Sequence, residues 1–315
     1  MLRKLKKLLA SRKLFANWLT AGIEYYLVSR GLTRIKSVDV ACRNGRVSIP
    51  VGAYRAIVND YCDGLLVEFN GRVVTYIGGV KVPVDELDKS DNVGRAIANG
   101  WSFNGSFWFK GNVKFVHMRG SILAIFERGY YGSVDVNGKD VVDVGAYVGD
   151  SAIYFALRGA RRVIAIEPHP LAYAEMLENI KLNNLENVII PVNAGVASRP
   201  GGLRIKGVDI KSTVSAYHKP SRSGPIPVIT LGDVISEYSI ADESVLKLNC
   251  QGCEYDVVLN DYRHVRVFKE VIIEYHAGSC ALFRVLSRDF ECHVVRETNS
   301  KYGLLKCIRK VKFKS

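Results

Sequence analysis

The sequence has 315 residues, of which 48% are hydrophobic and 24% are charged. These proportions are typical of a globular protein and exclude an intrinsically disordered chain. The formal net charge of +13 is concentrated at the two ends, because residues 1–36 hold nine Lys and Arg against the single Glu24, and residues 301–315 hold six Lys and Arg and no acid. The rest of the chain is therefore nearly neutral, which disfavours a basic nucleic-acid groove in the main body of the protein.

The seven cysteines are an odd number in a chain for which we expect no secretory signal. Such a set predicts reduced thiols and a cytoplasmic location rather than a disulfide framework. Cys250 and Cys253 are three residues apart in the stretch LKLNCQGCE, a spacing shared by redox dithiols and half zinc sites. No second Cys/His pair at zinc-ligand spacing accompanies them, so we expect no metal site and interpret both cysteines as small packing residues.

Residues 1–36 mix leucines and aromatic residues with lysines and arginines at helical spacing, which predicts a basic amphipathic helix. The segment lacks the uninterrupted apolar span of about 20 residues that a transmembrane helix needs. Two interpretations remain open. The helix either docks on the protein with one solvated face, or contacts a membrane or an acidic partner.

Residues 37–120 contain short β-rich runs, such as RVSIPV at 46–51 and GLLVEF at 64–69, separated by Gly, Asn and Asp. We interpret this region as a small β-rich part that caps the rest of the chain or shapes an acceptor pocket. Its aromatic residues are expected to form core, although they can also stack on a sugar ring; they are Trp101, Phe103, Phe107, Trp108 and Phe109.

From residue 121 to 315, apolar runs alternate with helical patterns, which predicts an α/β domain with a mostly parallel sheet covered by helices on both faces. The predicted strands are at 140–145, 161–168, 187–193, 244–249, 269–276, 290–298 and 302–313. The predicted helices are at 150–159, 170–184, 231–238 and 254–261. The short connection NSKY joins the last two strands and predicts an antiparallel C-terminal edge.

The stretch VVDVGAYVGDSAIYFA, residues 141–156, reads as a strand that contains Asp143, a turn with Gly145 and Gly149, and a helix. Ligands lie beyond the carboxyl ends of such strands, where glycine lets the backbone approach. The Gly-x-x-x-Gly spacing differs from the Gly-x-Gly-x-x-Gly of dinucleotide-binding proteins. A nucleotide-dependent dehydrogenase is therefore disfavoured.

The second predicted strand ends at Glu167, where a carboxylate can accept hydrogen bonds from both ribose hydroxyls of an adenosine cofactor. Acids at both strand ends without a dinucleotide pattern predict S-adenosylmethionine as the cofactor; a Gly-rich connection of any α/β domain is the alternative. Asn193 ends the third strand and either meets the adenine edge or caps a turn. Further positions predicted to contact the cofactor are Ala146, Tyr147 and Pro168.

With these residues in view, the chain from about residue 120 to 280 resembles the FkbM-type family of S-adenosylmethionine-dependent methyltransferases, in particular its archaeal-like members. The resemblance is carried by DVGAYVGDSAIYFALRGARRVIAIEPHP, ENIKLNN, VNAGV, LKLNCQGCEYDVV and IIEYH. It implies a Rossmann-like class I methyltransferase fold and methylation of an oxygen, often on a sugar, glycolipid or small metabolite. The family's cofactor residues correspond here to Asp143, Gly145, Gly149 and Glu167.

The family's fourth strand typically ends in Lys-x-Asp-x-Glu-Gly-x-Glu. This chain keeps Lys247, Gly252 and Glu254 but has Asn249 for the Asp and Gln251 for the first Glu. An amide cannot take up a proton, and it attracts a hard divalent cation less than a carboxylate does. If the family's acids act as a base or as metal ligands, this chain needs other groups.

The substitutes nearest in strand position are Glu254, Glu274 and His276, and His276 is the one that titrates near neutral pH. Lys247 is expected either to form a structural ion pair or to act in the site. The predicted catalytic residues are therefore Lys247, Asn249, Glu254, Glu274 and His276.

Two functions follow from this interpretation. The first is an S-adenosylmethionine-dependent O-methyltransferase acting on a small-molecule or glycan hydroxyl. The alternative is a cofactor-binding but catalytically weakened protein that its basic N-terminal helix recruits to a membrane or partner. An RNA methyltransferase is disfavoured by the near-neutral main body and by the lack of an Asn-Pro-Pro-Tyr-like motif.

Overall fold

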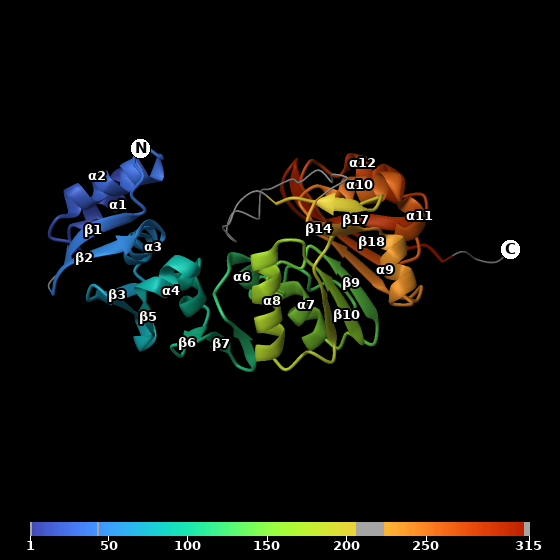
Figure 1. The fold of residues 1–315 in the computed structure, drawn as a ribbon, viewed down its shortest axis with the longest axis horizontal. Helices are drawn as coiled ribbons and strands as arrows, with labels where there is room; N and C mark the ends of the chain where they lie inside the picture. Colours follow the sequence, from blue (N-terminus) through green and yellow to red (C-terminus); the bar gives the residue numbers. More distant parts are fainter. Residues whose placement is uncertain (1, 43, 206–223, 312–315) are drawn as a thin grey trace. The chain divides into compact units, whose positions relative to one another are not determined.

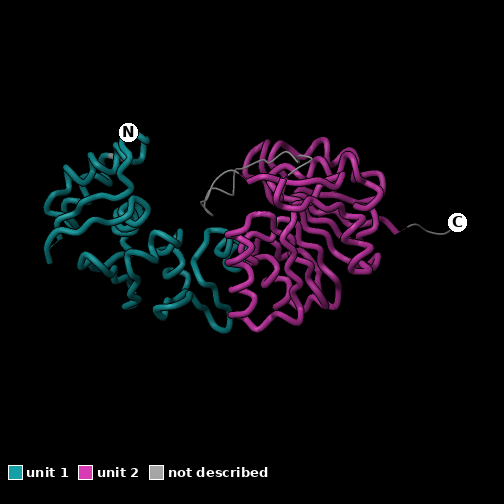
Figure 2. Tube along the Cα trace, in the orientation of Figure 1, with its two compact units in different colours: residues 1–128 teal, residues 129–315 magenta. Residues whose placement is uncertain are grey.

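The computed structural model describes residues 2–42, 44–205 and 224–311 and divides into two compact units, Met1–Arg128 and Gly129–Ser315 (Figure 2). Unit 1 holds both the predicted helical segment and the predicted β-rich region. Unit 2 holds the predicted α/β domain except for residues 121–128, which belong to unit 1. Each unit has its own elements and is described separately below.

Unit 1 begins with two helices, α1 (Leu2–Ser11) and α2 (Trp18–Ser29), where the sequence predicts one. Asn17 accounts for the break, because its side chain accepts a hydrogen bond from the Ala41 amide at 2.6 Å and donates one to the Asp39 carbonyl at 2.9 Å. These bonds tie the turn between the helices to a strand that follows much later in the chain. The single-helix prediction is therefore wrong, and the cause is a contact that no local pattern contains.

The remainder of unit 1 consists of three small antiparallel sheets with short helices between them (Figure 1). The sheets contain β1 (Ser37–Cys42) and β2 (Gly45–Pro50); β3 (Leu66–Phe69), β4 (Val73–Tyr76) and β5 (Lys81–Pro83); and β6 (Ser102–Phe103), β7 (Trp108–Lys110) and β8 (Val113–Phe115). The helices are α3 (Val51–Cys62), η1 (Ile77–Gly79), α4 (Val84–Lys89), α5 (Val93–Ala98) and α6 (Gly120–Phe126). The predicted β-rich runs at 46–51 and 64–69 coincide with strands, whereas α3 was not predicted.

Trp101 and Trp108 are buried in unit 1, with exposed fractions of 1% and 0%. Their indole N–H groups donate to Glu127 at 2.8 Å and to Glu86 at 2.7 Å, respectively. Both rings therefore belong to the core of unit 1 and are not presented to a sugar.

Unit 2 is built on a seven-stranded sheet with the order β11-β10-β9-β15-β16-β18-β17. Its strands are β9 (Asp140–Val144), β10 (Arg162–Ile166), β11 (Ile189–Val192), β15 (Val245–Leu248), β16 (Glu270–Tyr275), β17 (Phe290–Asn299) and β18 (Tyr302–Arg309). The first five run parallel, and β18 pairs antiparallel with both β16 and β17. The predicted Rossmann-like fold with an antiparallel C-terminal edge is confirmed.

The main helices of unit 2 are α7 (Asp150–Leu157), α8 (Pro170–Leu182), α9 (Leu231–Glu237), α10 (Cys253–Asn260), α11 (Tyr262–Val265) and α12 (Cys280–Leu286). From β9 the chain builds outward to β10 and β11, and it then returns to build β15 and β16 in the opposite direction. Because such crossovers are right-handed, the helices of the two halves cover opposite faces of the sheet. The reversal between β9 and β15 is the place where α/β sheets bind ligands, at the carboxyl ends of the strands.

A small second sheet of unit 2 was not predicted. It has the order β12-β14-β13 and consists of β12 (Gly195–Val196), β13 (Gly201–Leu203) and β14 (Ile226–Ile229). Within the described ranges, no helix is long and apolar enough to cross a membrane.

Candidate functional site

The turn between β9 and α7 carries two glycines with left-handed backbone angles, Gly145 at φ 78° and Gly149 at φ 83°. A Cβ atom at Gly145 would lie 1.9 Å from the Asn249 carbonyl oxygen, and one at Gly149 would lie 2.9 Å from Met176 Cγ. From the sequence, these glycines were predicted to let the backbone approach a ligand. The structure adds a second reason, which is that the end of β15 packs directly on the backbone of Gly145.

Glu167 follows the end of β10 and is 7% exposed. Its carboxylate accepts hydrogen bonds from the backbone amides of Tyr147 and His169, each at 2.8 Å. Burial raises the pKa of Glu167 to about 7, although these two bonds and the charge of Lys247 oppose the rise. Each carboxylate oxygen retains a lone pair, so the group can still accept two further hydrogen bonds.

Asn193 holds the chain that follows Glu167. Its side-chain amide donates to the Glu167 carbonyl at 2.9 Å and to the Pro168 carbonyl at 3.4 Å. Ala146, in the turn after β9, is fully buried and donates its amide to the Ile166 carbonyl at 3.0 Å. The predicted cofactor residues are therefore brought together around the ends of β9, β10 and β11, with Asn193 bonded to the backbone that carries Glu167.

Asp143 and Lys247 form a buried ion pair across β9 and β15. The Lys247 Nζ lies 2.7 Å from Asp143 Oδ1, and the two side chains are 2% and 0% exposed. Ser151 donates to the other carboxylate oxygen at 2.6 Å, and Lys247 also donates to the Gly145 carbonyl at 2.8 Å. Of the two roles expected for Lys247, the structure places it in the structural ion pair, which fixes the turn after β9.

Asn249, which follows β15, meets Glu274 near the carboxyl end of β16. The Asn249 amide donates to Glu274 Oε2 at 2.6 Å and lies 3.5 Å from the Tyr131 hydroxyl. Burial raises the pKa of Glu274, although the neighbouring positive charges and a hydrogen bond from Tyr130 oppose the rise. The amide nitrogen must face the carboxylate, since the reverse orientation would bring two oxygens together.

The Asn249 Oδ1 atom is consequently left facing away from Glu274. It is buried, and it has no hydrogen-bond partner among the residues that the structure describes. A buried acceptor without a partner is costly unless a ligand or water satisfies it. The position is therefore suited to accept a hydrogen bond from a bound molecule.

Gln251, His276 and Glu254 form a second chain of contacts beside this pair. His276 Nδ1 lies 2.9 Å from Glu254 Oε1, and its Nε2 lies 2.9 Å from the Gln251 amide nitrogen. Burial alone would lower the pKa of His276, but the hydrogen bond and charge of the fully buried Glu254 outweigh it and raise the pKa. Four of the five residues predicted as catalytic thus lie in these two contact groups, and the fifth, Lys247, lies in the ion pair with Asp143.

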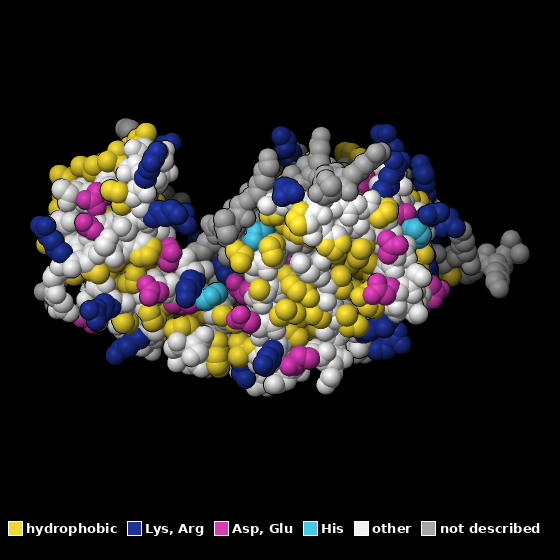
Figure 3. All heavy atoms as spheres, viewed as in Figure 1, with side chains coloured by type: hydrophobic (Ala, Val, Ile, Leu, Met, Phe, Trp, Pro, Cys, Tyr) yellow, Lys and Arg dark blue, Asp and Glu magenta, His cyan; other side chains and the backbone are white. Residues whose placement is uncertain are grey.

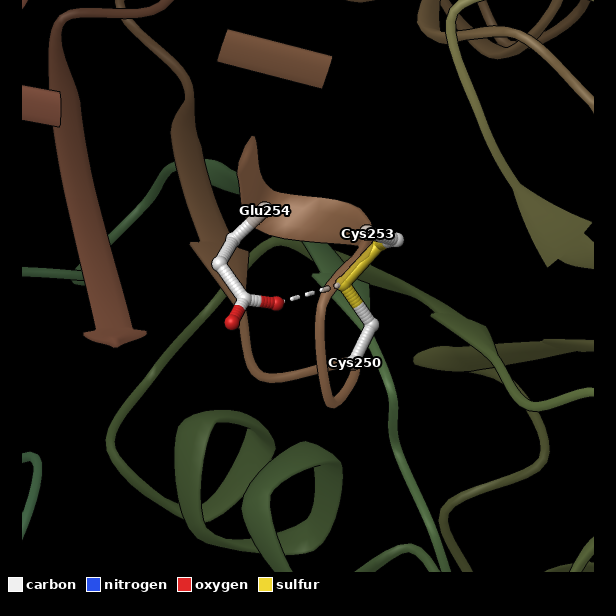
Figure 4. Close-up of side chains that lie close together, drawn as sticks. All are labelled: Cys250, Cys253 and Glu254. Carbon is white, nitrogen blue, oxygen red and sulfur yellow. Dashed lines mark hydrogen bonds between the residues drawn. A yellow bond between two sulfur atoms is a disulfide. The ribbon is translucent and has the colours of Figure 1, made fainter. Parts of the chain in front are cut away.

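The turn that carries Gln251 is closed by a disulfide between Cys250 and Cys253 (Figure 4). A second disulfide joins Cys292 on β17 to Cys307 on β18. The prediction of reduced thiols is wrong at these four positions, and the interpretation of Cys250 and Cys253 as mere packing residues is wrong with it. A spacing of three residues is compatible with free thiols, a metal site or a disulfide, and only the approach of the two side chains decides between them.

Sequence reasoning missed Tyr130, Tyr131 and Ser151. Tyr131 is 2% exposed, and burial together with the charge of Glu274 raises its pKa well above the usual value, so its hydroxyl stays protonated. It lies 118 positions before Asn249 in the chain. No local motif connects the two residues. Ser151, in contrast, lies in the first turn of α7, the helix that follows Asp143, and could have been proposed from the sequence as a hydrogen-bond partner of that carboxylate.

The residues present fit S-adenosylmethionine. The Glu167 carboxylate retains two acceptor positions just after the end of β10, and Gly145 and Gly149 add no side chain to the neighbouring turn after β9. The turn after β9 borders the reversal in the sheet and Glu167 follows the neighbouring strand β10, so both lie at the edge of the sheet where ligands of this fold bind. In that arrangement Glu167 would hold the ribose and the turn with Gly145 would lie against the rest of the cofactor.

Residues 143–291 match the family model described as the methyltransferase FkbM domain. Over 138 residues the chain is 25% identical to the hexuronic acid methyltransferase AglP of Haloferax volcanii, a match that covers 43% of this chain and 55% of that protein. Over 120 residues it is 29% identical to the tRNA (guanine(37)-N(1))-methyltransferase Trm5b of Methanocaldococcus jannaschii, covering 38% and 34%. The chain therefore spans about half or less of the length of these curated relatives.

Among solved structures, the chain is similar to a methyltransferase FkbM from Methylobacillus flagellatus, with 18% identity, a TM-score of 0.41 and coverage of 59% of this chain and 47% of that one. It is also similar to the TYW2 protein of M. jannaschii in complex with AdoMet, with 18% identity, a TM-score of 0.38 and coverage of 67% and 86%.

Proposed function

We propose, from the match of residues 143–291 to the methyltransferase FkbM domain, that this chain is an S-adenosylmethionine-dependent O-methyltransferase whose acceptor is a sugar hydroxyl. The observation that carries the proposal is the pairing of Asn249 with Glu274. It sets a carboxylate of raised pKa beside a buried amide oxygen without a partner among the described residues. The name of the haloarchaeal relative, a hexuronic acid methyltransferase, supports a uronic acid or a glycan that contains one as the acceptor.

Bound S-adenosylmethionine supplies a methyl group on a positively charged sulfur, which an oxygen nucleophile can accept in an in-line displacement. The residues of the chain orient the acceptor and remove its proton. Asn249 Oδ1 accepts a hydrogen bond from the acceptor, and Glu274 takes up the proton of the reacting hydroxyl. Burial raises the pKa of Glu274, which makes the carboxylate a better base than an exposed one.

The amides at positions 249 and 251 fit this scheme. A carboxylate at position 249 would lie against Glu274, and the two groups would have to share a proton or a cation. The Asn249 amide instead donates a hydrogen bond to Glu274 and needs neither. Gln251 likewise faces His276 Nε2, and its amide can present nitrogen to neutral histidine or oxygen to charged histidine. We infer that the substitutions adapt the site to work without a metal rather than mark lost catalysis.

The test begins with calorimetric titration of S-adenosylmethionine into the wild type and Glu167→Ala. We expect binding by the wild type and a large loss in the variant, because the ribose hydroxyls lose their acceptor. No binding by the wild type would refute the cofactor assignment. Transfer of an isotopically labelled methyl group is then measured on hexuronic acids and hexuronate-containing glycans, with tRNA as the comparison acceptor.

Glu274→Gln tests the base in the same assay. We expect kcat to fall by about 10²- to 10⁴-fold while cofactor affinity is kept, because Gln retains the contact with Asn249 but cannot take a proton. Glu291→Gln, an exposed carboxylate on β17, is the matched control and should leave kcat unchanged. Cofactor binding without transfer to any acceptor would favour the catalytically weakened alternative.

We further propose that α1 and α2 contact an anionic membrane surface. Exposed apolar side chains recur along one side of α2, at Leu19, Ile23, Tyr26 and Leu27, where a docked helix would bury them. Leu5 on α1 is also 55% exposed. Figure 3 shows hydrophobic and basic side chains interspersed on the surface of this part of the chain.

The charge of the segment supports a lipid partner. Residues 1–36 hold nine Lys and Arg against one acid, and anionic lipids attract such a cluster while the apolar side chains enter the interface. We expect sedimentation with vesicles of anionic phospholipid but not with neutral ones, and loss of binding in Leu19→Ser/Ile23→Ser. Leu177→Ser, an exposed leucine on α8, is the control. Self-association of the protein in place of vesicle binding would refute the proposal.

A further inference from the structure

The turn between β15 and α10 is closed on itself by the Cys250–Cys253 disulfide (Figure 4). The two residues inside this ring have positive φ angles, 58° at Gln251 and 124° at Gly252. A non-glycine residue adopts such an angle only where the surroundings hold it there. The ring therefore helps to hold Gln251 in the position from which it contacts His276.

We propose that Cys250–Cys253 is a redox-active disulfide, and that its reduction by an external dithiol changes the acceptor side of the active site. The statement about the disulfide stands on the geometry of the turn alone. The statement about the active site rests on the proposed methyltransferase function. No family match or relative described above assigns a role to these cysteines.

The two disulfides of the chain differ in their surroundings. Cys250 and Cys253 are both half-buried, and Cys253 is the first residue of the eight-residue helix α10. Amide groups at a helix N-terminus stabilise a thiolate, which makes such a cysteine a good leaving group in disulfide exchange. Cys292 on β17 is also half-buried, but its partner Cys307 on the paired strand β18 is fully buried, and neither cysteine lies at a helix N-terminus. The first disulfide is open to exchange, and the second is a structural cross-link.

The exchange balances as follows. A thiolate of the external dithiol attacks one sulfur of Cys250–Cys253, forms a mixed disulfide and releases the other cysteine as a thiolate. The second thiol of the external molecule then attacks the mixed disulfide. This releases the second protein cysteine, and the external molecule leaves as an intramolecular disulfide. Together, the two protein cysteines gain the two electrons and two protons that the dithiol loses.

Reduction would reach the site through Glu254. The Cys250 sulfur lies 3.4 Å from Glu254 Oε2, which also accepts the Gly252 amide at 2.7 Å, while Oε1 contacts His276 Nδ1. In the reduced form the Cys250 thiol has a proton to donate to this carboxylate. This hydrogen bond would draw on the negative charge of Glu254, which stabilises protonated His276. We therefore expect the pKa of His276 to fall on reduction.

A metal site is the competing interpretation of the same atoms. The ligand atoms of Cys250, Cys253 and Glu254 lie within 4.8 Å of one another. The two sulfurs are bonded to each other, however, and a sulfur in a disulfide is not a thiolate ligand. The structure therefore favours the disulfide, and a metal analysis of the reduced protein decides the point.

The test of the disulfide itself needs no substrate. The full chain is equilibrated in mixtures of reduced and oxidised dithiothreitol, free thiols are trapped with a maleimide, and labelled peptides are identified by mass spectrometry. We expect Cys250 and Cys253 to be labelled reversibly at ratios that leave Cys292 and Cys307 unlabelled. Labelling of both pairs only on unfolding, or retention of stoichiometric zinc by the reduced protein, would overturn the proposal.

The effect on the site is measured with two double variants. Methyl transfer should fall at least threefold on reduction in the wild type and in Cys292→Ser/Cys307→Ser, and Cys250→Ser/Cys253→Ser should not respond to dithiothreitol. Equal transfer in both redox states would refute control of the site. If no acceptor is methylated at all, it is the proposed function that fails. The coupling between the disulfide and His276 is then tested by NMR titration of His276 in the two redox states, and an unchanged imidazole pKa would refute it.

Discussion

From the proposed role of Glu167 in holding the ribose, we expect the protonation of this carboxyl to control cofactor binding over the physiological pH range. Burial raises the pKa of this carboxyl to about 7 in the ligand-free protein. The group is then about nine tenths ionised at pH 8 and about one tenth ionised at pH 6. Only the ionised form can accept hydrogen bonds from both ribose hydroxyls while it also accepts those of Tyr147 and His169. The observed Kd is the intrinsic value divided by the ionised fraction, so it should rise about tenfold from pH 8 to pH 6.

Isothermal calorimetry at half-unit intervals from pH 5.5 to 8 measures this dependence. Glu167→Gln is the matched control, because it keeps the size of the side chain and one acceptor oxygen but cannot titrate. We expect weaker binding by the variant at pH 8 and loss of the steep dependence, which leaves only the titration of the cofactor itself. A flat Kd in the wild type, or the same slope in the variant, would show that Glu167 does not hold the ribose.

The same pKa predicts an effect on stability with a defined sign. The pKa of Glu167 rises from 4.5 to about 7 on folding, so between these pH values the folded state holds a proton that the unfolded state has released. The free energy of unfolding therefore falls as pH rises through this window, by about 3 kcal/mol in total. Urea unfolding of the ligand-free protein should show this fall in the wild type, and it should be absent in Glu167→Gln.

Three further substitutions test the contacts of the site. Asn249→Asp places a second carboxylate against Glu274; repulsion of about 4 kcal/mol at 4 Å should keep one of the two protonated, shift the pH–rate profile to higher pH and lower transfer at pH 7. Lys247→Met leaves Asp143 as a buried charge without its partner and should lower the free energy of unfolding by about 3–5 kcal/mol in urea titrations. Gly145→Ala would place a Cβ atom against the Asn249 carbonyl at a position where φ is 78°. We expect it either to prevent folding, as measured by circular dichroism, or to abolish cofactor binding, as measured by calorimetry.

Lys247→Met and Gly145→Ala each have a control in unit 2. Lys139→Met breaks an exposed pair with Asp135 and should cost less than about 1 kcal/mol. Gly138→Ala imposes the same type of backbone strain at φ 69° but has open space around it, so it should fold and bind the cofactor. Higher transfer by Asn249→Asp would contradict the interpretation of Asn249 as an adaptation and would indicate that an ancestral activity had been lost.

The sheet of unit 2 could be predicted because its strands are continuous apolar runs between turn residues, and all seven were predicted. The opening helix was predicted as one rather than two, since the break depends on Asn17 bonding to β1, a contact distant in sequence. Helix α3 was missed because Val51–Cys62 follows a β-like run without a capping signal.

The candidate site could be predicted where it depends on strand ends. Asp143 and Lys247 are direct neighbours in the register of β9 and β15, so their ion pair follows once strand order is known. Tyr131 could not be found in this way, because it lies before β9 in a segment without a motif and reaches Asn249 only through the fold. Cys250 and Cys253 were predicted wrongly as reduced packing residues, because a spacing of three residues is compatible with several chemistries and does not show whether the two sulfurs meet.

The contact between Gly145 and Asn249 limits how such an enzyme can change its acceptor. The backbone of Gly145, which the proposed function places against the cofactor, touches Asn249, the first residue of the proposed acceptor turn, with no room for a side chain between them. A graft that replaces the acceptor turn as a whole would displace the cofactor turn as well. New acceptor specificity is therefore more readily acquired by substitutions from Gln251 onward, with Asn249 retained as the fixed contact that both halves of the site share.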